Sequence, residues 1–234
     1  MLMENNIYAI SYRLRRELYH RIFSVVTVAL LFFIIVSFLM TFIVFPVANK
    51  SESMSPDIPA GSYAFVSPLF KNPGRGDVVL LQNYDGARFG AAKRLLRSLS
   101  LFVTFGKWQP FEQKPVAGTR PVIRRVVGLP GDTLYIDRYV VFVKPEGKNH
   151  FLTEFEVTES VYSAKILLPP AMWDQDLGAK SSFEQITLGE DEYFVLGDDR
   201  LSSSDSRMWG PVKHEKILGK ILMLYFPFGK FRTF

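Results

Sequence analysis

The feature that most constrains this chain is an uncharged apolar run near its N-terminus. The run extends from Ile22 to Ala48 and contains no Asp, Glu, Lys, Arg or His. As a helix it would be roughly 40 Å long, which exceeds the ~30 Å hydrocarbon core of a bilayer. A cleaved signal peptide and a buried core helix are the alternatives, but signal-peptide apolar regions span about 7–15 residues. The run therefore predicts a tilted transmembrane helix with Pro46 near its end.

The charges that flank this run predict its orientation. Lys50 is the one cation that follows closely, whereas four arginines precede the run with two glutamates among them: Arg13, Arg15, Arg16 and Arg21. The positive-inside rule then predicts a cytoplasmic tail at residues 1–21, a helix at 22–48 and an extracytoplasmic domain at 49–234. We expect a single-pass protein of the inner (cytoplasmic) cell membrane.

Composition narrows the chemistry of the extracytoplasmic domain. The chain has no cysteine, so neither a disulfide framework nor a cysteine metal site can form. We expect no metal and no cofactor. The net charge is +5 and the pI about 9.3, yet a nucleic-acid partner is not expected outside the cytoplasm, and no readout motif is present. Nothing in the sequence indicates an oligomeric state.

Short runs rich in Val, Ile, Phe and Tyr recur in the domain at 49–234. Turn sequences separate them: Pro-Ala-Gly, Asn-Pro-Gly, Leu-Pro-Gly-Asp and Leu-Gly-Asp-Asp. We predict a mostly β fold, an antiparallel sheet or barrel-like domain behind one N-terminal transmembrane helix. The expected strands are Tyr63–Val66, Asp77–Leu81, Val122–Val127, Thr133–Ile136, Val140–Lys144, Tyr193–Leu196 and Ile217–Phe226.

One segment of the domain, residues 88–125, has an unusual charge pattern. It carries many Lys and Arg residues against the single Glu112, interleaved with Leu, Phe and Trp. The segment reads as a basic amphipathic insertion. Two interpretations stay open: it binds anionic membrane lipid or a protein partner, or its apolar face packs on the β domain while its cations reach water.

Three clusters of residues follow the apolar run in a set order. The first, at 51–56, is Ser-Glu-Ser-Met-Ser-Pro. The second joins Gly76-Asp77 to Arg-Arg-Val-Val-Gly-Leu-Pro-Gly-Asp at 124–132. The third joins Gly-Asp-Asp-Arg at 197–200 to Ser-Ser-Asp-Ser-Arg at 203–207. In order and spacing they resemble bacterial signal peptidase I.

The resemblance implies a membrane-bound serine endopeptidase that removes signal peptides from exported preproteins with a Ser/Lys dyad. Ser53 matches the nucleophile, and its N–H would be one donor of the oxyanion hole. Ser51 matches the hydroxyl that supplies the second donor. Met54 and Ile123 match residues that line pockets for small substrate side chains. Ser203 matches the serine that orients the general base.

The same resemblance assigns structural roles and marks differences near the serine. Asp205 and Arg207 match a structural ion pair. Asp57 stands where the family usually has Thr, and Asp199 where it usually has Asn. We expect Asp57 to alter the turn that follows the nucleophile.

The largest departure from the family is at the position of its catalytic lysine. This chain has Arg124 there. A buried lysine can lose its proton and then accept one from serine, whereas a guanidinium stays protonated and is only a donor. An active signal peptidase with another base and a catalytically silent relative that binds preproteins or a partner peptidase both stay open. The retained serines favour the enzyme, and Arg124 favours the silent relative. Of the two we expect the enzyme, a serine endopeptidase in which the usual Ser/Lys mechanism cannot operate.

The charge pattern gives a testable topology. In membrane vesicles of known sidedness, a protease added to the external face should digest residues 49–234, because the arginine-rich flank keeps the N-terminus in the cytoplasm. Immunoblotting against the C-terminus measures the digestion. Loss of this domain to a protease on the cytoplasmic face would contradict the orientation.

Overall fold

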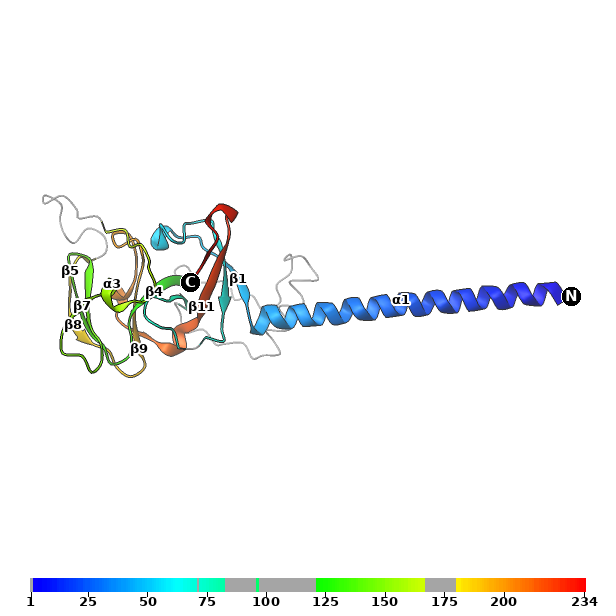
Figure 1. The fold of residues 1–234 in the computed structure, drawn as a ribbon, viewed down its shortest axis with the longest axis horizontal. Helices are drawn as coiled ribbons and strands as arrows, with labels where there is room; N and C mark the ends of the chain where they lie inside the picture. The colour runs from blue at the N-terminus through cyan, green and yellow to red at the C-terminus, as the bar shows by residue number, and fades with distance from the viewer. Residues whose placement is uncertain (1, 71, 83–95, 97–120, 167–179) are drawn as a thin grey trace. The chain divides into compact units, whose positions relative to one another are not determined.

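The structure is a computed structural model that describes residues 2–70, 72–82, 96, 121–166 and 180–234 (Figure 1). Of residues 2–14, 40 and 41 it describes the backbone alone. The chain divides into two units, residues 1–41 with 89–111 and residues 42–88 with 112–234, and each is considered by itself. The basic insertion at 88–125 lies almost entirely outside the described residues, so both interpretations of it stay open.

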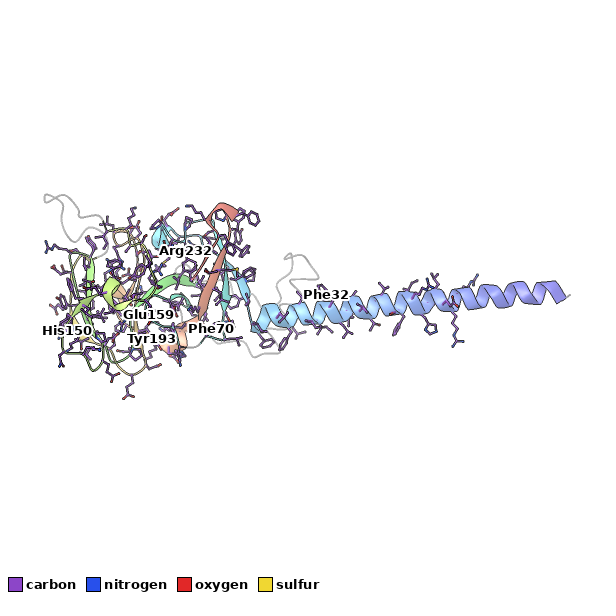
Figure 2. The ribbon with its side chains drawn as sticks, viewed as in Figure 1. Phe32, Phe70, His150, Glu159, Tyr193 and Arg232 are labelled. Atoms are coloured by element: carbon purple, nitrogen blue, oxygen red, sulfur yellow. The ribbon has the colours of Figure 1, made fainter. Side chains whose placement is uncertain are left out.

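The described part of the first unit consists mainly of one long helix, α1 (Leu2–Phe42). Its stretch Arg15–Leu39 is long and apolar enough to cross a membrane by length and composition, and 6% of that window is buried. Phe32, for example, points outward from the helix and is 69% exposed (Figure 2). An apolar helix that leaves its side chains uncovered fits a membrane anchor.

The helix ends earlier than the apolar run. After α1 ends at Phe42, residues Phe45–Ala48 form strand β1, which pairs antiparallel with β2 (Tyr63–Ser67). The expected helix boundary at Ala48 is therefore wrong. The physical reason is Pro46, which lacks a backbone N–H and is tolerated on an edge strand such as β1.

The second unit contains two antiparallel sheets, so the predicted mostly β fold is confirmed. The larger sheet has the order β1-β2-β11-β3-β4-β9-β10, with β12 paired to β11. Its remaining strands are β3 (Val78–Leu81), β4 (Val122–Gly128), β9 (Glu192–Leu196), β10 (Val212–Lys213), β11 (Ile217–Phe226) and β12 (Arg232–Thr233).

The smaller sheet has the order β7-β6-β5-β8. Its strands β5, β7 and β8 are labelled in Figure 1. Its strands are β5 (Thr133–Asp137), β6 (Val140–Lys144), β7 (Leu152–Thr153) and β8 (Phe183–Thr187). Short helices join the strands: η1 (Glu52–Met54), α3 (Glu154–Val157), α4 (Ser206–Trp209), η2 (His214–Lys216) and η3 (Phe228–Lys230).

The apolar core explains why strand β4 is central. Almost all of β4 is buried, because β3 and β9 flank it and apolar side chains cover both of its faces. Ile123 joins one apolar cluster, Val126 a second and Val127 a third. The cluster that contains Ile123 also contains Met54, so burial of apolar surface holds η1 against the sheet.

A buried ion pair links helix α3 to the loop that follows strand β9. Arg200 donates to both oxygens of Glu154 at 2.7 and 2.6 Å, and both side chains are essentially unexposed. The hydroxyl of Tyr162 donates to the same carboxylate. Burial and the charge of Glu154 raise the pKa of Tyr162 above its ordinary value. The tyrosine therefore stays protonated and remains a donor.

We expect Arg200→Met to lower the free energy of unfolding by about 3–5 kcal/mol, because it leaves the Glu154 carboxylate buried without its partner. The double variant Arg200→Met/Glu154→Leu should recover most of this loss. Urea denaturation of the full chain in detergent, followed by circular dichroism, measures both. The exposed Arg138→Gln is the control and should change stability by less than about 0.5 kcal/mol. An unchanged stability in Arg200→Met would contradict the account of this pair.

Candidate active site

Ser53 lies in the short helix η1, directly after strand β1. The hydroxyl of Ser51 caps this helix by accepting a hydrogen bond from the Ser53 N–H at 3.2 Å. The two serine hydroxyl oxygens are 2.9 Å apart. Ser53 is 5% exposed, and the adjacent Met54 is fully buried in the core. The capped turn and the buried Met54 side chain therefore hold Ser53 in place. Ser51 lies next to it, as the sequence predicts.

The loop after β9 holds the backbone of Ser53. The carbonyl of Ser53 accepts from the Asp199 N–H at 3.0 Å and from the Ser203 hydroxyl at 3.1 Å. Gly197 makes this approach possible, since a Cβ there would lie 2.7 Å from the Ser53 carbonyl oxygen and against the Ser203 hydroxyl. Ser203 thus contacts the backbone of Ser53, and its single hydroxyl proton is shared between the carbonyl oxygens of Ser53 and Asp199.

Arg124 on strand β4 contacts Ser53 directly. Its Nη1 donates to Ser53 Oγ at 2.8 Å and also to the carbonyl of Ile123. Its Nε and Nη2 donate to the carbonyl of Ser204 at 2.9 and 2.6 Å. The residue is 4% exposed. The sequence placed Arg124 and Ser53 in one site but missed Ser204, because a backbone carbonyl acceptor leaves no signal in residue type.

No carboxylate within the described part of the chain lies within 4.0 Å of the Arg124 guanidinium nitrogens. Burial lowers the pKa of Arg124, and the more distant charge of Asp205 opposes that effect. A guanidinium remains protonated near neutral pH even so. Arg124 is therefore a buried cation that donates to a serine and offers no lone pair.

The acidic residues around the site pair with other arginines. Asp205 accepts from Arg207 at 2.8 Å, and both are buried. Asp198 accepts from Arg125 at 2.8 and 2.7 Å. Burial alone would lower the pKa of Arg125, but its hydrogen bonds to Asp198 raise that pKa overall. These ion pairs support the loops around Ser53.

Asp57 has a role that its residue type alone did not reveal. Its carboxylate accepts from Arg125 at 3.0 Å and from Arg232 at 2.6 Å. Arg232 lies on β12, near the C-terminus (Figure 2). Asp57 therefore connects the turn after Ser53 to two strands of the larger sheet, β4 and β12.

Met54 and Ile123 lie in the same apolar cluster and are 0% and 5% exposed. Both are packed side chains rather than open pocket walls in this structure, and their predicted contact with substrate stays a prediction. Across the described ranges, no three His, Asp or Glu side chains come together as metal ligands.

Comparison with known proteins identifies the family. The family model described as signal peptidase, peptidase S26, matches residues 22–226. Signal peptidase I P of Bacillus subtilis subsp. natto is 28% identical over 209 residues, 87% of this chain and 89% of the relative. Signal peptidase IB of Staphylococcus aureus strain Mu50 is 22% identical over 222 residues, 94% of this chain and 95% of the relative.

Two further similarities are less complete. Signal peptidase I of Streptococcus pneumoniae strain R6 is 29% identical over 136 residues, which are 50% of this chain and 66% of the relative. The crystal structure of a signal peptidase I from Enterococcus faecalis V583 aligns over 64% of this chain and 96% of that chain. The identity is 21% and the TM-score 0.31, a structural similarity too low to support a conclusion. The family model covers most of the chain, residues 22–226, and by that match this chain belongs to the signal peptidase family, peptidase S26.

Proposed function

We propose that this protein recognises the signal peptides of exported preproteins at the membrane, as a relative of signal peptidase I whose Ser/Lys chemistry is silenced. Membership of the family supports signal peptides as the ligand, and the apolar helix supports the membrane as the location. The single observation that carries the silencing is the hydrogen bond from Arg124 Nη1 to Ser53 Oγ at 2.8 Å.

The chemical reason lies in the partners of the Ser53 hydroxyl. Serine becomes a nucleophile when an adjacent base removes its proton. Ser53 Oγ has two partners among the described residues, the Ser51 hydroxyl and the Arg124 guanidinium, and neither is a base near neutral pH. Ser53 therefore stays protonated while both partners remain in place.

Another lysine could in principle supply the base. Lys165 is the candidate, because it lies beside the loop that holds Ser53. Its backbone bonds to Asp198 and Arg200, beside the loop that holds Ser53. However, its Nζ lies 3.0 Å from Asp199 and its side chain is 49% exposed. Despite the opposing effect of burial, Lys165 lowers the pKa of Asp199, as expected for a charged pair. Lys165 is thus engaged as a cation.

A slow Ser53 endopeptidase is the second candidate, and one observation favours it. The Ser53 N–H and the Ser51 hydroxyl remain next to Ser53 Oγ, where the oxyanion of a tetrahedral intermediate would form. A cation at Arg124 would also stabilise that oxyanion. In this candidate the proton of Ser53 goes to water, so the rate is low.

Replacing Arg124 with lysine tests which candidate holds. We expect wild type to cleave a signal-sequence peptide no faster than Ser53→Ala, because neither partner of the Ser53 hydroxyl in the described part of the chain is a base. Arg124→Lys should raise turnover by about 10²–10⁴-fold, the usual contribution of a positioned base. Burial lowers the pKa of a lysine, and its neutral form is the base. Turnover of Arg124→Lys should therefore rise with pH through that lowered pKa.

Two variants complete the experiment. Arg124→Lys/Ser53→Ala should return to background, since the lysine has no role without the nucleophile. Arg138→Lys makes the same change at an exposed side chain and should leave turnover at the wild-type level. If wild type cleaves as fast as Arg124→Lys while still requiring Ser53, the protein is an active endopeptidase and another group is its base.

A further inference from the structure

We propose that Arg124 and the two serines form a receptor for a peptide carboxylate, so that this protein prefers the free C-terminal end of a cleaved signal peptide to an uncut one. The inference rests on the proposed function, which supplies the peptide. It adds the chemical group that the site recognises.

The buried arginines differ in whether a carboxylate balances their charge. Four arginines in the described residues are buried: Arg124, Arg125, Arg200 and Arg207. Three of them have a carboxylate oxygen at 2.6–2.8 Å, from Asp198, Glu154 and Asp205 respectively. Arg124 has carbonyls and a hydroxyl instead. A buried charge without an opposite charge is costly, so this position favours the arrival of an anion.

The hydrogen-bond partners of the Arg124 guanidinium indicate which side of it a bound anion could approach. Two carbonyls, from Ile123 and Ser204, occupy the sides of the guanidinium that face the protein backbone. The bond from Nη1 to Ser53 Oγ is the one that Arg124 makes to a side chain among the described residues. Ser53, with the Ser51 hydroxyl beside it, is therefore the side chain through which Arg124 can act on a ligand.

The contact with Arg124 also affects the proton of Ser53. Because Arg124 donates to Ser53 Oγ, the Ser53 O–H is free to donate in turn, either to Ser51 Oγ or to a ligand. A hydroxyl that accepts from a cation is polarised into a stronger donor. The serine becomes a donor to anions in the place where the family has a nucleophile.

A receptor for a carboxylate would distinguish a cleaved signal peptide from an uncut one. An uncut signal sequence presents a neutral peptide carbonyl at this position, whereas a cleaved one ends in a carboxylate. The carboxylate can accept from the Ser53 and Ser51 hydroxyls and supply the negative charge that Arg124 lacks. Complementary charge at a buried site is worth more than at the surface, so the free acid should be bound preferentially.

The test compares three forms of one peptide on the full-length protein in detergent. The peptide is the C-terminal half of a signal sequence, prepared as the free acid, as the C-terminal amide, and extended beyond the cleavage position. Fluorescence anisotropy gives the three dissociation constants. We expect the free acid to bind about tenfold more tightly or better than the amide and the extended peptide.

Two variants assign the preference to its residue. Arg124→Gln keeps hydrogen-bond donors, removes the charge, and should abolish the difference between acid and amide. Arg138→Gln removes an exposed cation as a matched control and should keep the difference. A preference for the acid that persists in Arg124→Gln would overturn the role of Arg124.

The wild-type comparison needs no variant, so it stands even if Arg124→Gln does not fold. Equal binding of acid, amide and extended peptide would overturn the carboxylate receptor and leave the proposed recognition of signal peptides intact. Failure of all three forms to bind would overturn both.

Discussion

The hydrogen bond from the Arg124 guanidinium to Ser53 Oγ, 2.8 Å long and buried, is the contact on which the rest of the site depends. It requires β4 in the interior of the larger sheet, between β3 and β9, so that residue 124 meets η1 from inside the domain. It also requires the carbonyls of Ile123 and Ser204, which hold the guanidinium plane. A protonated arginine fixed in this way makes Ser53 an acceptor from a cation rather than a proton donor to a base.

The surrounding ion pairs keep that contact rigid. Asp57, four residues after Ser53, binds Arg125 in the sheet and Arg232 near the C-terminus. Asp205 binds Arg207 and also accepts from the backbone of Gly197, in the loop that holds the Ser53 carbonyl. Segments far apart in the sequence thus fix one turn of helix. Under the proposed function, this arrangement is the frame of a peptidase site in which arginine stands at the position of the general base.

Sequence reasoning located the strands that have clear patterns, and its catalytic assignments remain predictions. The strands it missed have physical explanations: β7, β10 and β12 have two residues each, and β8 does not alternate between buried and exposed positions. It extended the helix to Ala48 because an apolar strand after a membrane helix looks like more helix. It brought Ser51, Ser53 and Arg124 together, but it could not foresee that Ser203 contacts the Ser53 carbonyl, since that depends on the backbone approach at Gly197.

The protonation state of Arg124 tests the central claim most directly. Carbon-13 NMR of the guanidinium carbon, on full-length protein labelled at arginine, reports this charge as a function of pH. The Arg124 resonance, assigned by its loss in Arg124→Lys, should keep the chemical shift of a charged guanidinium from about pH 6 to 10. It should shift in Ser53→Ala, because Nη1 then loses the Ser53 hydroxyl and keeps only the Ile123 carbonyl as acceptor. A titration of Arg124 within that range would show that arginine can become neutral beside Ser53, and it would contradict the account.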